Sequence, residues 1–348
     1  MNTHHSTEPA RLGSNENLLG PSPMALKAIQ ETVSNAHIYA TVEDKKLQEK
    51  LVARVGRGLT ADQLVLGNGS GDVLRGIIQA HILPGDEIVI PTATFAIYKR
   101  AGSEHRANVI EIPLADDYQI DYDGLLAAVT PKTKLIFLCN PNNPTGLITT
   151  HTQMRSFLER CPNYVTVVVD EAYIDFADDP NFPDMMEFIN EGFPVIVTRT
   201  FSKLYGLASL KAGYGFGNTE RMAPVRERRH VHQSGLMMYA GASAALDDEE
   251  HVVNTLDMAQ EGRAFIYKEL DRLGLSYLPT QALFVLLTDV PLDAQLIVDE
   301  ALEDNVILRH THVFGMPGYV RFSIGRQQDN ERGIAALERI LKKHGVLK

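Results

Sequence analysis

The chain has 348 residues, of which 44% are hydrophobic and 22% are charged. This composition is typical of a globular protein with a large core, and the formal net charge of −11 argues against a broad surface for nucleic acid or anionic membranes. The two cysteines, Cys139 and Cys161, make no disulfide framework, and no apolar segment is typical of a signal peptide or a membrane span. We therefore expect a cytoplasmic protein without nucleic-acid or membrane partners.

Short apolar strands alternate with amphipathic helices between residues 62 and 217. A strand and turn over residues 62–71 are followed by a helix over residues 72–83, which Pro84 and Gly85 end. Helix-like stretches follow over residues 122–131 and 150–161. Further strands are expected over residues 87–91, 108–113, 134–141, 165–173 and 194–201. This alternation is typical of a mainly parallel sheet with helices on both faces.

The pattern changes after Asp247. A long helix is expected over residues 248–275, and a smaller α+β segment follows it. We therefore divide the chain into an N-terminal arm (residues 1–45) that packs with the small domain, a large domain (residues 46–246) and a small C-terminal domain (residues 247–348).

Polar and glycine-rich segments follow several of the expected strands. They are GNGSGD (67–72), NPNNPTG (140–146), DEAY (170–173) and TFSK (200–203). Because ligands bind at the carboxyl ends of strands in such sheets, these segments are candidates for one site. GNGSGD also opens a helix, whose free N–H groups could receive a phosphate. Each segment has an ordinary structural interpretation as well, as a turn, a helix cap or a solvated lysine.

The order of these segments, ending with VRFSIG (320–325), resembles the fold-type-I pyridoxal-phosphate aminotransferases. With NEN and GPSP near the N-terminus, the chain is most similar to the histidinol-phosphate aminotransferase group, over residues 15–341. The resemblance implies a large domain with a mainly parallel seven-stranded sheet, a smaller α+β domain and bound pyridoxal 5'-phosphate. It also implies transfer of an amino group from an amino acid to a 2-oxo acid or a related carbonyl.

The resemblance assigns roles around the cofactor ring. Lys203 resembles the lysine that forms a Schiff base with the cofactor. Such a role suits a buried lysine near other cations, because its amine loses proton affinity and can act as a nucleophile. Asp170 resembles the carboxylate that pairs with the pyridine nitrogen. Tyr173 and Asn143 resemble the partners of the phenolic oxygen, and Phe95 resembles the aromatic residue that stacks on the ring, although plain core packing would also explain Phe95.

A second group resembles the residues that hold the cofactor phosphate. Lys211 stands where the family usually has arginine, and as a point charge it lacks the bidentate fork. Tyr39 resembles a tyrosine that reaches the phosphate in the other subunit, which implies a homodimer with composite active sites. The remaining members are Ser70, Gly71, Thr200 and Ser202.

The substrate end is only partly like the family. Arg321 resembles the arginine that clamps the substrate α-carboxylate, Arg309 matches the arginine for the distal phosphate, and Asn143 is shared with the substrate. Leu19 stands in place of a tyrosine and Leu283 in place of an amide. Loss of such polar partners predicts weak activity on histidinol phosphate and better activity on another amino acid with a polar or charged side chain.

Several alternatives stay open at this point. The segment 226–233 is rich in cations and contains His230 and His232, whose role is open; His-x-His pairs without further ligands give only a weak metal signal, and we expect no metal. A pyridoxal-phosphate decarboxylase, cyclase or oxidase acting on a polar or arginine-like amino acid is the alternative function. A non-catalytic, cofactor-binding regulatory protein is a remote one.

Overall fold

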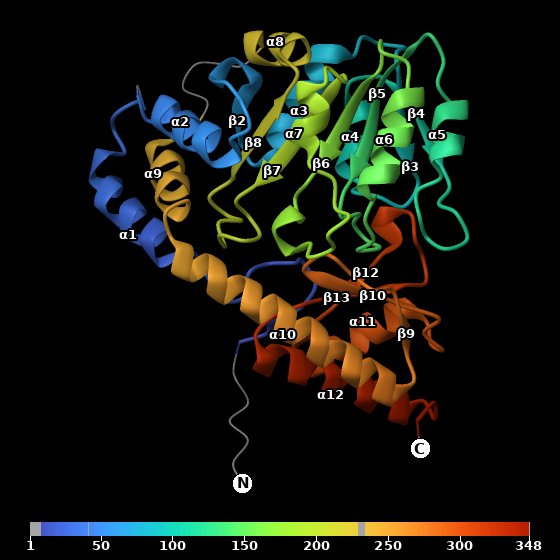
Figure 1. Cartoon of the computed structure of the whole chain (residues 1–348). Coiled ribbons are helices and arrows are strands. Elements are labelled where there is room, and N and C mark those ends of the chain that lie inside the picture. The colour runs from blue at the N-terminus through green and yellow to red at the C-terminus, as the bar shows by residue number, and fades with distance from the viewer. Residues whose placement is uncertain (1–7, 41, 229–233, 348) are drawn as a thin grey trace.

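The computed structural model describes residues 8–40, 42–228 and 234–347. A seven-stranded sheet forms the centre of the larger part of the molecule (Figure 1). All neighbouring strands in it are parallel except β8, which runs antiparallel to β2 and β7. Across the sheet the strands are β2 (Leu64–Asn68), β8 (Ala212–Gly217), β7 (Val195–Thr200), β6 (Thr166–Asp170), β5 (Thr133–Cys139), β3 (Glu87–Pro91) and β4 (Asn108–Ile112).

Helices cover both faces of this sheet, as the alternation of elements predicts. Successive strand residues point to opposite faces, so Val167 and Val169 join one hydrophobic cluster while Val168 joins another. The first cluster includes residues of α2 (Glu43–Val55), α5 (Tyr122–Ala127), α6 (His151–Arg160), α7 (Met185–Asn190) and α9 (Leu236–Ala245). The second includes residues of α3 (Ser70–His81), α4 (Ile97–Glu104) and α8 (Thr219–Glu227).

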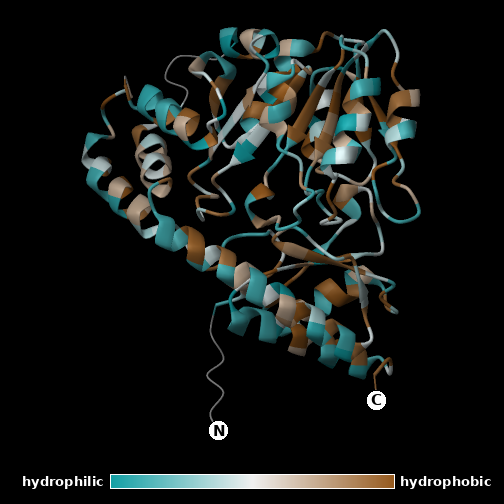
Figure 2. Ribbon diagram, viewed as in Figure 1, coloured by the Kyte–Doolittle hydropathy of each residue, from teal (hydrophilic) through white to brown (hydrophobic). Residues whose placement is uncertain are grey.

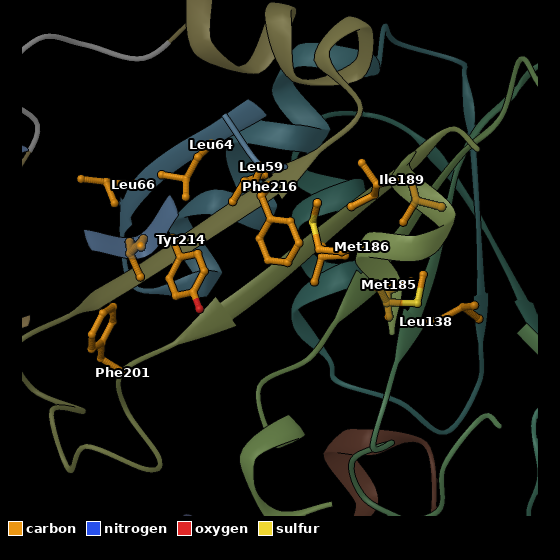
Figure 3. Close-up of a cluster of buried hydrophobic side chains, with 14 of the residues drawn as sticks. Leu59, Leu64, Leu66, Leu138, Met185, Met186, Ile189, Phe201, Tyr214 and Phe216 are labelled. Atoms are coloured by element: carbon orange, nitrogen blue, oxygen red, sulfur yellow. The ribbon is translucent and has the colours of Figure 1, made fainter. Parts of the chain in front are cut away.

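The hydropathy of the chain follows this layering. Figure 2 shows mainly hydrophobic strands in the central sheet and helices with hydrophilic outer faces. Figure 3 shows part of the first cluster, where Tyr214 and Phe216 of β8 lie near Leu64 and Leu66 of β2. Burial of such apolar surface is the main contribution to the stability of the domain.

The smaller part contains a four-stranded antiparallel sheet in the order β12 (Arg309–His310), β13 (Val320–Ser323), β10 (Phe284–Thr288) and β9 (Ser276–Tyr277). The expected long helix is α10 (Glu249–Leu273), which ends at Gly274 in the left-handed conformation. It runs beside α12 (Gln327–Lys343) along the outside of this part, with α11 (Ala294–Glu303) also packed there (Figure 1). The proposed domain boundary lies just before α10.

The N-terminal arm contacts both parts of the molecule. Its strand β1 (Ala10–Arg11) pairs in parallel with β11 (Val306–Ile307) of the small part. Its helix α1 (Pro23–Thr32) instead packs against α9 of the large part. Short 3-10 turns complete the described elements: η1 (Val33–Asn35), η2 (Ala61–Gln63), η3 (Ile174–Phe176) and η4 (His312–Phe314). Within the described ranges, no helix has the length and apolar character needed to cross a membrane.

Candidate active site

A cavity of about 520 Å³ opens where the large sheet meets the small part and the arm. Its described lining residues include four cationic side chains and a single carboxylate, so the cavity favours anionic ligands. Every residue that the sequence analysis assigned to cofactor or substrate lines this cavity, with the exception of Tyr39. These residues are Ser70, Gly71, Phe95, Asn143, Asp170, Tyr173, Thr200, Ser202, Lys203, Lys211, Arg309 and Arg321.

Lys203 lies in the turn after β7 and lines the cavity. Its Nζ donates hydrogen bonds to the backbone carbonyls of Ser14 (3.2 Å) and Asn15 (2.9 Å). Burial, reinforced by the cations Arg321 and Lys211, lowers the pKa of Lys203 to about 8, although Glu16 and Asp170 act in the opposite direction. A larger fraction of the amine is therefore neutral near pH 8 than for an ordinary lysine.

Asp170 is the last residue of β6, and its side chain is almost completely buried. Its two carboxylate oxygens accept hydrogen bonds from the Tyr98 hydroxyl (2.9 Å) and the Thr198 hydroxyl (3.0 Å). Burial raises the pKa of Asp170 to about 6, while these hydrogen bonds oppose that rise. Asp170 is therefore mostly ionised above that pH.

Tyr98 was not singled out from the sequence. It is fully buried, and its ring lies edge-on to Phe95, with centroids 5.8 Å apart. The available signal was its spacing: Tyr98 stands three positions after Phe95, and its N–H donates to the Phe95 carbonyl (3.3 Å) in the turn that leads into α4.

Tyr173 lies at the cavity wall just before η3, and its hydroxyl oxygen accepts a hydrogen bond from Asn15 Nδ2 (2.8 Å). Burial raises the pKa of Tyr173 to about 12, opposed by Arg321 and by that hydrogen bond. Tyr173 is therefore protonated at neutral pH and can donate a hydrogen bond. Asn15 also lines the cavity, although the sequence analysis gave it no role.

Arg321 on β13 lines the small-domain side of the cavity and is held by two hydrogen bonds. One Nη donates to Asn143 Oδ1 (2.5 Å) and the other to the carbonyl of Gly13 (2.8 Å). Its guanidinium lies between the rings of Phe284 and Phe314, 5.1 and 4.9 Å from their centroids. Burial lowers the pKa of Arg321 to about 10, and its buried Nε has no hydrogen-bond partner within the described ranges.

Arg309 on β12 lies beside Arg321. Its Nε donates to the same Gly13 carbonyl (3.0 Å), and an Nη donates to the Ser14 hydroxyl (3.1 Å). The shared carbonyl brings the two guanidinium groups next to each other at the cavity. Two adjacent guanidinium groups fit the charge of a substrate phosphate or carboxylate.

The amino end of α3 also lines the cavity and could bind an anion. Gly69 precedes this helix with φ 83° and provides no side-chain cap, so the N–H groups of Ser70 and Gly71 face the cavity without an intrahelical partner. Strand β8 lies very close to this helix end: a Cβ atom added to Gly213 would lie 2.2 Å from Ser70 N. Lys211 lies beside this helix end in the cavity wall, as do Thr200 and Ser202, whose hydroxyls are hydrogen-bonded to each other (2.9 Å).

Three further predictions concern residues outside the cavity. Tyr39 is 77% exposed and does not line it, so its role toward a second subunit stays a prediction. His230 and His232 lie outside the described residues. The Nδ1 atoms of His310 and His312 are 2.8 Å apart, and the described part of the chain holds no group of three or more metal-ligating side chains.

The donor set fits pyridoxal 5'-phosphate. A lysine amine of lowered pKa, a buried carboxylate at the next strand end and a helix amino terminus with a lysine beside it are three distinct features of one cavity. They match an aldehyde, a protonated pyridine nitrogen and a phosphate, respectively.

The sequence matches the family model "Aminotransferase class I and II" over residues 7–337, so the chain belongs to this family. This confirms the prediction of an α/β fold-type-I pyridoxal-phosphate aminotransferase. Its relatives include histidinol-phosphate aminotransferase from Moorella thermoacetica, with 37% identity over 95% of this chain and 85% of the relative. Histidinol-phosphate aminotransferase 2 from Carboxydothermus hydrogenoformans is 39% identical over 95% of this chain and 91% of the relative.

A solved structure has the same fold. The histidinol-phosphate aminotransferase from Sinorhizobium meliloti, determined in complex with pyridoxal 5'-phosphate, superposes with a TM-score of 0.88 and 28% identity. The alignment covers 97% of this chain and 93% of that one. The relatives' names favour the aminotransferase prediction over a decarboxylase, cyclase, oxidase or regulatory protein.

Proposed function

We propose that the cavity holds pyridoxal 5'-phosphate and that Lys203 is the residue to which it is attached. The observation that supports this most is the meeting of Lys203, Asp170 and the amino end of α3 in one cavity. The phosphate would lie against Ser70, Gly71 and Lys211, and the pyridine nitrogen against Asp170. When bound, this cofactor supplies an aldehyde that exchanges with amines and a ring that accepts the electrons released at the substrate α-carbon.

The surrounding side chains would act as binding and proton-transfer groups. Asp170, ionised above pH 6, favours a protonated pyridine nitrogen. Tyr173 and Asn143 would donate to the phenolic oxygen, and Phe95 would cover the ring. Once its amine is free, Lys203 can take a proton from the substrate α-carbon and return it one position further, because its pKa of about 8 is close to neutrality.

For the substrate we propose an amine that carries a phosphate, with histidinol phosphate as the leading candidate. The adjacent guanidinium groups of Arg309 and Arg321 support this choice, as do the names of the relatives. The prediction of weak activity on this substrate assumed that Leu19 and Leu283 face it. Neither lines the cavity: Leu283 is buried in the small-domain core, and Leu19 is 42% exposed. The structure therefore does not support that assumption.

The second substrate would be a 2-oxo acid, which accepts the amino group.

We also propose that the protein is a cytoplasmic homodimer. Seven large hydrophobic side chains between Leu19 and Val42 are more than 40% exposed, and Tyr39 is among them. An apolar surface gathered in one segment favours self-association.

The substrate proposal is tested by steady-state kinetics on histidinol phosphate, histidinol and a panel of amino acids. We expect the highest kcat/KM for histidinol phosphate. Arg309→Gln should lower that value about ten- to a hundredfold, because the phosphate loses a charged partner, and should change kcat/KM for histidinol little. A higher kcat/KM for an amino acid without phosphate, unaffected by Arg309→Gln, would contradict the proposal.

A further inference from the structure

Asn15 lies in the cavity wall in a backbone conformation that few residues adopt. Its φ is 53°, in the left-handed region, which asparagine tolerates better than most residues with a side chain. The residue is 1% exposed and comes from the arm, 158 positions before Tyr173, whose hydroxyl it contacts. A strained backbone that presents a buried polar side chain to a reaction site points to a functional role.

Two hydrogen bonds with Ser323 define how the Asn15 amide is oriented. The backbone N–H of Asn15 donates to Ser323 Oγ (2.9 Å), and the Ser323 hydroxyl donates to Asn15 Oδ1 (2.7 Å). Because a backbone N–H can only donate, Ser323 Oγ accepts there and its one proton goes to Oδ1. The opposite amide orientation would place two donors on Ser323 Oγ, and the buried hydroxyl would lose the acceptor of its proton.

This orientation sets the direction of the Tyr173 hydroxyl. Asn15 Nδ2 donates to the Tyr173 oxygen at 2.8 Å, so the proton of Tyr173 is not used in that contact. We propose that Asn15, held by Ser323, is a positioning residue that directs the Tyr173 proton into the cavity, toward an anionic oxygen bound there. The inference rests on the proposed role of Tyr173 opposite the phenolic oxygen of the cofactor.

Other charged or titratable groups also face Tyr173. Arg321, Cys139 and Asp170 lie close enough to influence its ionisation, and Lys203 Nζ lies 5.6 Å from the centroid of its ring. Within the described ranges, Asn15 Nδ2 is the group that makes a hydrogen bond with the Tyr173 hydroxyl. These neighbours and Asn15 all shift the pKa of Tyr173, but the hydrogen bond from Asn15 also sets the direction in which the hydroxyl proton points.

The test is a pH titration of the absorbance of the holoenzyme, which reports protonation at the bound cofactor rather than turnover. Asn15→Asp keeps the shape and tolerates the left-handed conformation, but it replaces the donor by an acceptor that draws the Tyr173 proton away. We expect the absorbance transition to move upward by about one pH unit, as loss of one hydrogen bond to an ionised oxygen implies. Ser323→Ala, which adds no charge, should move it in the same direction by less.

The same substitutions in a Tyr173→Phe background separate the effect of the direction of the Tyr173 proton from the effect of the charge that Asn15→Asp introduces. There, Asn15→Asp should retain only the shift caused by its charge, and Ser323→Ala should have no effect. Equal shifts in both backgrounds, or an unmoved transition in Ser323→Ala, would overturn the proposal. Ser323→Ala removes a single hydroxyl, so it decides the question even where Asn15→Asp does not fold. An unmoved transition in Tyr173→Phe alone would instead refute the proposed role of Tyr173.

Discussion

Burial shifts the pKa values of two ionisable groups in the cavity wall in opposite directions. It lowers the pKa of Lys203 to about 8 and raises that of Asp170 to about 6. Each shift disfavours the charged form of its own group. Between these two pH values the carboxylate is mostly ionised, while the neutral fraction of the amine grows with pH. The pair is therefore suited to pyridine recognition and nucleophilic attack in the same pH range.

The Lys203 assignment predicts where and at what pH the apoprotein captures pyridoxal phosphate. Because only the neutral amine is nucleophilic, the rate of capture should rise with a midpoint near pH 8, against about 10.4 for an ordinary lysine. Borohydride reduction followed by peptide mapping should place the pyridoxyl group on Lys203. A label on Lys211, or a midpoint near that of an ordinary lysine, would contradict the assignment.

Asp170 and Glu171 offer a matched pair of neighbouring, buried carboxylates. Glu171 faces away from the cavity and pairs with Arg199 at 2.8 Å. Asp170→Asn should lower kcat about a hundredfold or more, because the pyridine nitrogen loses its charged partner. Glu171→Gln should keep turnover and lower the free energy of unfolding by about 1–3 kcal/mol. Kinetics and denaturant unfolding of both variants check this, and equal losses of kcat would refute the distinct role of Asp170.

Residues in short motifs could be found from the sequence, and residues that act through tertiary contact could not. Lys203, Asp170 and Asn143 follow strands in recognisable segments, which the resemblance made specific. Asn15 approaches Tyr173 only because the arm lies along β13, where Ser323 N donates to the Leu12 carbonyl. That contact depends on how the arm docks, which no local pattern indicates.

Among the elements, the alternation of strands and helices predicted the layers of the large domain but not the order of its strands. Strand β8 lies between β2 and β7 and runs opposite to both. Its position depends on pairing between residues far apart in the chain, which sequence periodicity does not encode. The expected packing of the whole arm with the small domain was also too simple, because α1 packs against α9.

The close approach of β8 to α3 predicts the effect of a single methyl group. Gly213→Ala would place its Cβ 2.2 Å from Ser70 N, so the helix end must shift. Such overpacking costs about 1–3 kcal/mol, and we expect pyridoxal phosphate to bind at least about tenfold more weakly to this variant. Gly76→Ala, in the same helix with 3.9 Å to its nearest neighbour, is the control and should bind normally. Unchanged binding by Gly213→Ala would contradict the proposed phosphate position.

For the whole molecule, the exposed apolar side chains of the arm region predict the assembly state. Ile38 is 53% exposed within this segment, whereas Leu83 is 67% exposed elsewhere on the large domain. Light scattering should give about twice the chain mass of 38.5 kDa for the wild type. Ile38→Asp should lower the measured mass toward that of one chain, because it places a charge in an apolar interface. Leu83→Asp should leave the dimer intact. A monomeric wild type would refute the composite site at Tyr39.

The central claim, that the protein moves an amino group, is tested most directly by following the nitrogen through one half-reaction. Holoenzyme is mixed with nitrogen-15-labelled histidinol phosphate in the absence of an oxo acid, then denatured and examined by mass spectrometry. We expect about one equivalent of the corresponding carbonyl product per active site and the heavy nitrogen in released pyridoxamine 5'-phosphate. Heavy nitrogen that stays in the donor or appears as ammonia, with the cofactor recovered unlabelled from this donor and from every labelled amino acid tested, would contradict the assignment.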